Sequence, residues 1–151
     1  MSLAGKLESE IEVNAPAHRF YQFFKHEISH VVNVCPNLIK KIKVHKGDWK
    51  DHCHGSIKVW NYVVDDKAEE LKERVEFDDK NLVVCMIGLE GDVFEHYKVF
   101  KAIFKFVPKG PNRSAVILIL EYEKLHDGPP YPHKYHDAMH KLAKDIESHL
   151  K

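Results

Sequence analysis

The sequence has no apolar run of the roughly 18 residues that span a bilayer, and its N-terminus lacks the basic-then-apolar layout of a secretory signal peptide. It also lacks an excess of either charge, because 23 basic residues balance 23 acidic ones among 151 residues. A chain of zero formal net charge has no overall field to attract nucleic acid or an anionic membrane. We therefore expect a cytoplasmic protein whose partners are neither membranes nor nucleic acids.

Cysteine and glycine are also scarce. Cys35, Cys53 and Cys85 are odd in number and scattered, which argues against a disulfide framework and fits a reducing compartment. The segment GDWKDHCHG, from Gly47 to Gly55, lacks the successive small residues of a phosphate-cradling loop. We therefore expect no nucleotide, and no other cofactor.

Histidine is abundant, with 12 residues, but its spacing completes no metal site. His133, His136 and His140 lie three and four apart, near one face of a predicted helix, while His52 and His54 crowd a loop. No acidic or cysteine cluster completes either set of ligands. We therefore expect solvated surface histidines and no metal.

The only long segment with a helical period is the C-terminus, from Pro130 to Lys151. About twenty helical residues make a rod of roughly 30 Å, about the diameter of a small domain. Its apolar stripe therefore needs a cover, and a curved sheet is the plausible one. The apolar positions are Tyr131, Tyr135, Ala138, Met139, Leu142, Ala143, Ile146 and Leu150.

The residues before this helix alternate as β-strands do. Strands are expected over residues 6–13, 38–45, 56–64, 70–77, 82–89, 97–107 and 114–124. Asn14 is a good N-cap and Pro16 suits a first turn, so a short helix should follow, with a second over residues 27–34. This order predicts an α+β fold: a seven-stranded curved antiparallel sheet wrapped around the long C-terminal helix, with two short helices after the first strand. No repeat or linker interrupts it, so residues 1–151 should form a single domain.

Several stretches along the whole chain match one known family. They are GKLE (5–8), GDW (47–49), GSIKVWNY (55–62), KER (72–74), EGD (90–92), YK (97–98) and EYEK (121–124). In these residues the chain resembles the plant major latex protein family of the Bet v 1, or pathogenesis-related class 10, superfamily. The resemblance implies a helix-grip fold with a large cavity for hydrophobic plant metabolites, and a link to defence and stress responses.

Two charged residues, Lys58 and Glu73, fall on strand faces otherwise assigned to the interior. They could pair with each other or lie near a cavity mouth, because buried charges are usually partnered. They could instead be polar anchors for a ligand, since binding pockets are mostly apolar with a few placed polar groups. In birch-allergen-type relatives, the position that matches Lys58 faces the cavity.

The aromatic residues could be ordinary core, or they could form flat walls for flat ligands such as flavonoids, steroids or alkaloids. We predict a ligand-binding cavity with Met139 as an adaptable part of its surface. Its predicted lining residues are Phe24, Lys58, Trp60, Tyr62, Leu71, Glu73, Val84, Met86, Phe100, Leu118, Tyr135, Met139 and Leu142.

The leading hypothesis is a monomeric binding or carrier protein for hydrophobic, lipid- or steroid-like metabolites, with no catalytic residue assigned. The alternative is an isomerase or condensing enzyme for an alkaloid-like substrate. Relatives with such activity use a lysine on the penultimate structural element, where this chain has Val116, Leu118 and Leu120. Lys58 and Glu73 could act as the acid and base instead.

Overall fold

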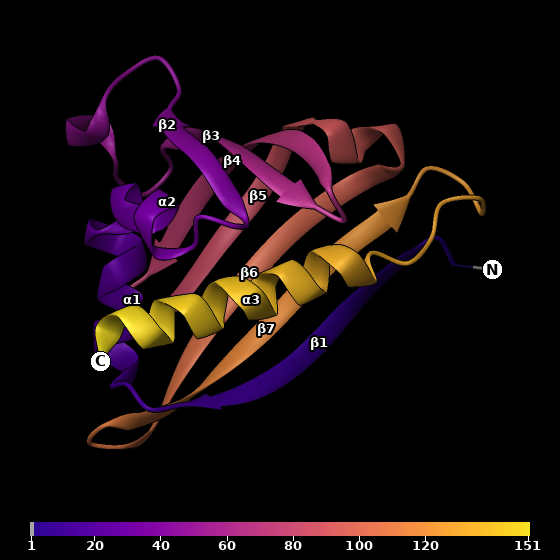
Figure 1. The fold of residues 1–151 in the computed structure, drawn as a ribbon. Helices are drawn as coiled ribbons and strands as arrows, with labels where there is room; N and C mark the ends of the chain where they lie inside the picture. Colours follow the sequence, from indigo (N-terminus) through magenta and orange to yellow (C-terminus); the bar gives the residue numbers. More distant parts are fainter. Residues whose placement is uncertain (1) are drawn as a thin grey trace.

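A computed structural model describes residues 2–151 as one curved antiparallel sheet that wraps along a long helix (Figure 1). The strands are β1 (Ala4–Val13), β2 (Ile39–Val44), β3 (Ile57–Val64), β4 (Lys67–Asp78), β5 (Val83–Gly91), β6 (Tyr97–Gly110) and β7 (Arg113–Lys124). The helices are α1 (Ala17–His26), α2 (Val31–Val34) and α3 (His133–Leu150), with short 3-10 turns at η1 (Ile28–His30), η2 (Trp49–Asp51) and η3 (Asp92–Glu95). The predicted α+β fold is confirmed.

The sheet has the order β1-β7-β6-β5-β4-β3-β2, so β2 to β7 follow one another as hairpins and β1 returns to β7. The β3–β4 hairpin turns through Asp65 and Asp66, whose φ angles are 53° and 62°. Positive φ at both central residues is typical of a type I′ turn, whose twist matches that of the flanking strands. This tight turn fixes the register that sets Lys58 opposite Glu73.

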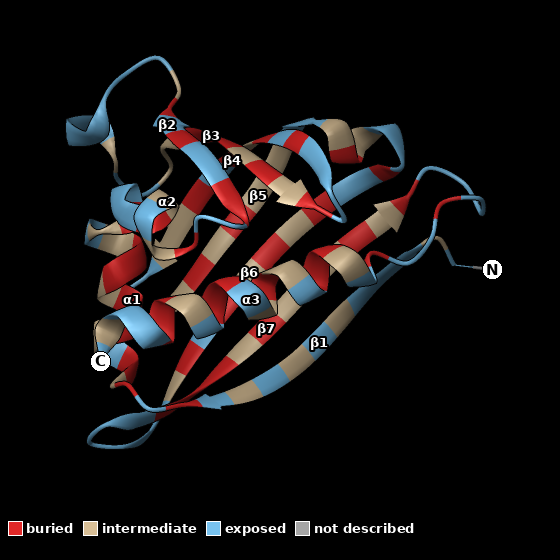
Figure 2. Ribbon diagram, in the orientation of Figure 1, coloured by how far each residue is buried: buried red, intermediate tan, exposed pale blue. Residues whose placement is uncertain are grey.

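Burial follows the alternation expected from the sequence. On β3, the inward side chains of Lys58, Trp60, Tyr62 and Val64 are buried, whereas Ile57, Asn61 and Val63 on the other face are partly exposed; Val59 on that face is also buried. Figure 2 shows the same banding on the strands and a buried stripe along α3. The side chains of that stripe include Tyr135, Met139, Leu142, Ala143 and Ile146. None of the helices in residues 2–151 is long and apolar enough to cross a membrane.

The start of α1 differs from the prediction. Pro16, rather than Asn14, occupies the N-cap position, and it makes no side-chain capping bond. The backbone N–H of Asn14 instead donates to Glu147 Oε2 on α3, at 2.6 Å. The assignment of Asn14 as the cap was wrong because α1 begins at Ala17, so Asn14 lies two residues before the N-cap position.

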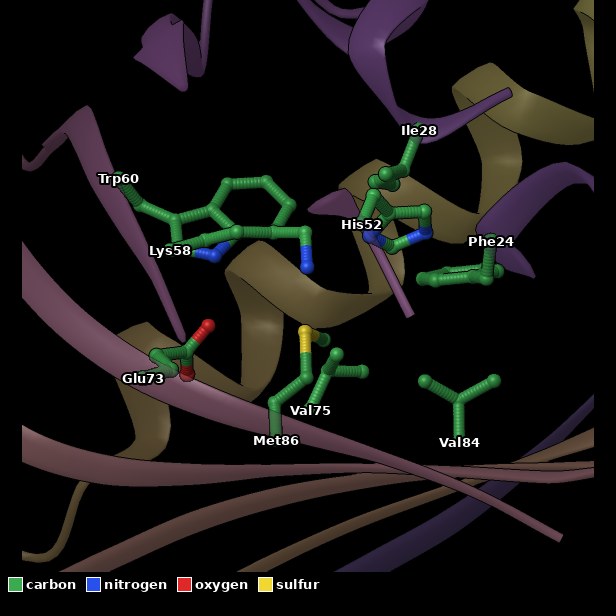
Figure 3. A pocket seen from close by; sticks show the side chains of 9 residues that line it. All are labelled: Phe24, Ile28, His52, Lys58, Trp60, Glu73, Val75, Val84 and Met86. Carbon is green, nitrogen blue, oxygen red and sulfur yellow. The ribbon is translucent and has the colours of Figure 1, made fainter. Parts of the chain in front are cut away.

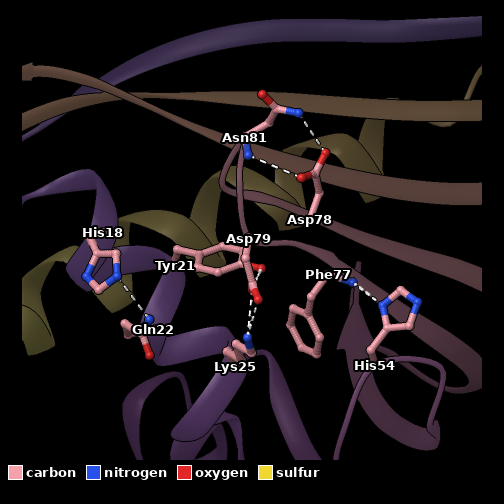
Figure 4. Close-up of polar contacts among 9 residues, drawn as sticks. All are labelled: His18, Tyr21, Gln22, Lys25, His54, Phe77, Asp78, Asp79 and Asn81. Atoms are coloured by element: carbon pink, nitrogen blue, oxygen red, sulfur yellow. Dashed lines mark hydrogen bonds and ion pairs between the residues drawn. The ribbon is translucent and has the colours of Figure 1, made fainter.

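Aromatic packing fills the end of the sheet at which α1 lies. The Phe20 and Phe106 rings stack with centroids 5.1 Å apart, and Phe24 lies 5.0 Å from Phe104. At the same end, Lys25 on α1 forms an ion pair of 2.7 Å with Asp79, in the turn between β4 and β5 (Figure 4). Side chains of α1, β6 and the β4–β5 turn are therefore closely packed at this end of the sheet.

Candidate functional site

An apolar cavity of about 100 Å³ lies between α3 and the inner face of the sheet. We call it the apolar cavity. Its walls come from β2 to β6, from the residue before β2, and from α3. The lining residues are Leu38, Ile39, Trp60, Tyr62, Val64, Leu71, Glu73, Met86, Phe100, Ala102, Phe104, Tyr135, Ala138, Met139 and Leu142.

The size of the apolar cavity restricts what it can hold. A single water needs roughly 10–15 Å³, and pockets for drug-sized ligands measure about 300–1,000 Å³. At about 100 Å³, the space is smaller than the large cavity that the family resemblance implied. It has room for a group the size of a small ring, and a larger ligand requires wall side chains to move.

A smaller space adjoins the apolar cavity, and we call it the Lys58 chamber (Figure 3). Its volume is about 10 Å³, close to that of one water. Trp60, Glu73 and Met86 line both spaces, so these side chains lie where the two spaces adjoin. The other lining residues are Phe24, Ile28, His52, Lys58, Val75 and Val84.

Lys58 and Glu73 face each other across the β3–β4 pair, with 3% and 6% of their surfaces exposed. The Lys58 Nζ donates to Ser56 Oγ at 2.6 Å. Among residues 2–151 neither side chain forms an ion pair within 4.0 Å, so the expected alternative of a close Lys58–Glu73 pair is wrong. The strand register places Lys58 opposite Glu73, but the lysine donates its hydrogen bond to Ser56 and not to the Glu73 carboxyl group.

Burial changes the protonation of both groups. It lowers the pKa of Lys58 to about 8, against the opposing effects of Cys53 and Glu73. Burial also raises the pKa of Glu73 to about 8, and the Lys58 charge offsets only part of this increase. Near neutral pH, the chamber therefore favours a neutral carboxylic acid and holds an amine that gives up its proton far more readily than an exposed lysine.

His52 enters the Lys58 chamber from the loop between β2 and β3. Both of its ring nitrogens are buried, with no hydrogen-bond partner in the described part of the chain. Burial lowers the pKa of His52, and the charge of Lys58 lowers it further. The sequence had placed His52 among surface histidines, which was wrong, because a loop has no periodicity to reveal an inward side chain.

Glu69 is a buried carboxylate that the sequence reasoning missed. With 6% of its surface exposed, it accepts hydrogen bonds from the Tyr62 hydroxyl at 2.9 Å and the Tyr135 hydroxyl at 2.8 Å. Burial, followed by the interactions with Glu69, raises the pKa of both phenols well above the ordinary value. Both tyrosines therefore remain hydrogen-bond donors, and their orientation in the cavity wall is fixed by this carboxylate.

The structure places nearly all the predicted site residues around the two spaces. Phe24, Lys58 and Val84 line only the Lys58 chamber. Leu118 lines neither space: it is fully buried, and its backbone carbonyl accepts a hydrogen bond from the His136 ring at 3.0 Å. Here α3 lies so close to β7 that packed side chains fill the interval. The remaining predicted residues, all on the apolar cavity, are Trp60, Tyr62, Leu71, Glu73, Met86, Phe100, Tyr135, Met139 and Leu142.

Two histidines of α3, His136 and His140, contact Ser9 on β1. His136 is buried, contrary to expectation, and His140 Nε2 lies 2.6 Å from the Ser9 hydroxyl. Within residues 2–151, no three or more histidine, cysteine, aspartate or glutamate side chains are grouped to hold a metal ion.

Comparison with known proteins identifies relatives over the full chain. Residues 2–151 match the family model described as the pathogenesis-related protein Bet v 1 family. MLP-like protein 328 of Arabidopsis thaliana is 34% identical over 99% of this chain and 98% of its own length. Major latex protein 22 of Papaver somniferum is 32% identical, over 98% of this chain and 91% of its own.

Solved structures agree with the fold. The crystal structure of ginseng major latex-like protein 151 from Panax ginseng aligns with a TM-score of 0.90 and 29% identity, over 98% of both chains. A truncated norcoclaurine synthase from Thalictrum flavum has a TM-score of 0.79, with 99% of this chain and 94% of the synthase covered. At 16% identity, the synthase is evidence for a common fold only.

Proposed function

The chain belongs to the Bet v 1 family, among the plant major latex proteins, and from this premise we propose that it carries small hydrophobic molecules. The observation that carries the proposal is the apolar cavity of about 100 Å³ between the sheet and α3. Apart from the Glu73 carboxyl group and the hydroxyl groups of Tyr62 and Tyr135, its wall is apolar and aromatic. This is the composition expected of a small-molecule site. Residues 1–151 act as one ligand-binding domain.

The ligand is a flat apolar molecule, of which flavonoids, steroids and alkaloids are the candidate classes. Any of these exceeds the present volume, so entry requires the wall to open. Met86 and Met139 are the adaptable parts of the wall, because an unbranched thioether side chain changes rotamer at low cost. Beside them, Ala138 gives α3 a narrow surface toward the cavity.

The carrier is favoured over a condensing enzyme by the size of the Lys58 chamber. A condensing enzyme must hold two reactants beside its acid and base. The chamber that contains Lys58 and Glu73 has room for about one water. We propose that the protein works as a cytoplasmic monomer without a cofactor, and that its contribution to defence or stress responses is the delivery or storage of its ligand.

Binding of an apolar fluorescent probe tests the proposal. Ala138→Leu adds side-chain volume directly to the cavity wall and should weaken probe binding about tenfold or more, since overfilling a packed space is costly. Ala68→Leu is the matched control, because Ala68 is exposed on β4. Displacement of the probe by a flavonoid, a sterol and an alkaloid then ranks the ligand classes. A wild type that binds no probe, or equal affinity in wild type and Ala138→Leu, would overturn the proposal.

A further inference from the structure

Lys58 is a buried amine with no carboxylate oxygen of residues 2–151 within 4.0 Å of its Nζ. Buried lysines are usually paired with an acid, because an isolated ammonium loses its hydration on burial. Within residues 2–151, the Lys58 Nζ donates one hydrogen bond, to the Ser56 hydroxyl. Other strand lysines, such as Lys72 and Lys101, have acidic partners within 4.0 Å on the outer face of the sheet. Lys58 is thus held where its neutral, nucleophilic form is far more populated than in an exposed lysine.

The surroundings of Lys58 suit a reaction with a bound molecule. Figure 3 shows the Lys58 amine, the Glu73 carboxyl group and the His52 ring directed toward one space beside Met86. Because Trp60 and Met86 also line the apolar cavity, a ligand seated in that cavity can extend one end into the chamber. The site thus combines an apolar wall for the body of a ligand with an amine and an acid at its end.

We propose that Lys58 captures small apolar aldehydes as an imine, with Glu73 as the proton donor. The inference rests on the proposed carrier function, since the apolar cavity must first bind the hydrocarbon part of the aldehyde. It assigns to the protein a reversible covalent site for one ligand class.

The reaction balances with the groups present. The neutral Lys58 amine attacks the aldehyde carbon, an N–C bond forms, and a proton moves from nitrogen to oxygen to give a carbinolamine. Glu73, as a neutral acid, protonates the hydroxyl, the C–O bond breaks, and water leaves. The products are a protonated imine on Lys58 and a carboxylate on Glu73, which is its counter-ion. No oxidant or reductant is required.

Two further observations support this assignment. The chamber has the volume of about one water, which is the size of the leaving group. The neutral His52 ring, whose nitrogens have no hydrogen-bond partner among residues 2–151, offers that water one acceptor nitrogen and one N–H donor. The small volume of the Lys58 chamber also favours aldehydes over ketones. The carbonyl carbon of an aldehyde carries a hydrogen, whereas that of a ketone carries a second carbon group that would have to enter the same space.

Reductive trapping tests the inference on the wild-type protein. The protein is incubated with benzaldehyde and sodium cyanoborohydride at pH 7.5, and the N-benzylated lysines are identified by peptide mass mapping. An amine of pKa about 8 is then about one-quarter neutral, against roughly one part in a thousand for an ordinary exposed lysine. We expect labelling of Lys58 at least tenfold above that of any exposed lysine, such as Lys105 on β6. Labelling spread evenly over exposed lysines, with Lys58 unmodified, would overturn the proposal.

Variants sharpen the test. Lys58→Met should remove the dominant label, and Lys105→Met, at an exposed position on another strand, should leave it unchanged. Glu73→Gln should slow the labelling of Lys58 about tenfold or more. It should also change the pH profile between pH 6 and 9 from a maximum near pH 8 to a steady rise, because only the deprotonation of Lys58 then sets the rate. The titratable groups that face Lys58 are Glu73, His52 and Cys53. Unchanged rate and pH profile in Glu73→Gln would refute its assigned role.

Toluene separates this inference from the carrier proposal, because it has the ring of benzaldehyde without the carbonyl. Toluene binding to wild type is measured by calorimetry beside the trapping experiment. If toluene binds and Lys58 stays unlabelled, the covalent site is refuted and the carrier stands. If toluene does not bind and Lys58 is unlabelled, both proposals fail.

Discussion

Replacing Glu73 by glutamine should stabilise the fold, and the gain should grow as the pH rises from 5 to 8. Burial holds the pKa of Glu73 at about 8 in the folded protein, against 4.5 for the ordinary carboxyl group. Between these values the folded protein keeps a proton that the unfolded chain releases, so the free energy of unfolding falls as the pH rises. Glutamine has nearly the same shape and no charge, so the free energy of unfolding of the variant does not fall in this way as the pH rises.

The magnitude follows from the width of that pH range. One pKa unit corresponds to about 1.4 kcal/mol, so a rise from pH 5 to pH 8 costs the wild type on the order of 3–4 kcal/mol relative to the variant. The variant and the wild type should differ little at pH 5, where both side chains are mostly neutral in the folded state. Above pH 8 the difference should level off, because folded and unfolded chains are then both ionised.

Urea denaturation at pH 5, 6, 7 and 8 measures this difference. Glu76→Gln is the matched control, because Glu76 lies on the same strand with its side chain on the opposite face. For the control we expect a nearly constant difference from wild type. A Glu73→Gln variant that is less stable than wild type at pH 8 would refute the reasoning, since it would show that Lys58 stabilises Glu73 as a carboxylate.

Three further outcomes are expected. Tyr135→Phe removes a hydroxyl donor from buried Glu69 and should lower the free energy of unfolding by about 1–3 kcal/mol in urea; no change would contradict the hydrogen bond. Glu147→Gln should cost about 1.5–3 kcal/mol at pH 7, because it weakens the bond from the Asn14 N–H. Although burial raises it, the bonds from Asn14 and Lys144 hold the pKa of Glu147 below its ordinary value of 4.5. This stability is therefore present above pH 4.5 and is lost as the pH falls through the lowered pKa, and a difference between variant and wild type that persisted at pH 2 would argue against it. Phe20→Ala should cost about 3–5 kcal/mol by thermal unfolding, whereas a loss below 1 kcal/mol would mean that the α1 end is not packed.

The alternation of apolar and polar residues along the strands predicted most of the fold and much of the candidate site. Because side chains alternate strictly along a strand, Lys58 and Glu73 could be placed on the inner face without coordinates. The same rule would have found Glu69, which has the parity of Glu73. It was missed because the predicted strand began at residue 70, whereas β4 begins at Lys67.

The other differences arise from contacts that no local pattern encodes. His52 enters the chamber from a loop, and the Asn14 N–H is taken by a carboxylate on α3. Leu118 has the correct parity for a cavity wall, but the approach of His136 fills the space in front of it. Cavity volume depends on these distances between elements, so composition and periodicity predict which side chains face inward but not how much room they leave.

The pairing of β1 with β7 has a consequence for how the chain is synthesised. Ala4 lies opposite Glu123 and Val13 opposite Ser114. The first strand to leave the ribosome, β1, therefore cannot pair until the last strand, β7, has been synthesised. The β2–β7 hairpins can form earlier, because each joins neighbours along the chain. Until residue 124 emerges, β1 is an unpaired strand with Leu7 and Ile11 available to the wrong partner, such as the same strand of another nascent chain. We expect β1 to join last, and its acidic outer residues, Glu8, Glu10 and Glu12, to keep neighbouring nascent chains apart during that delay.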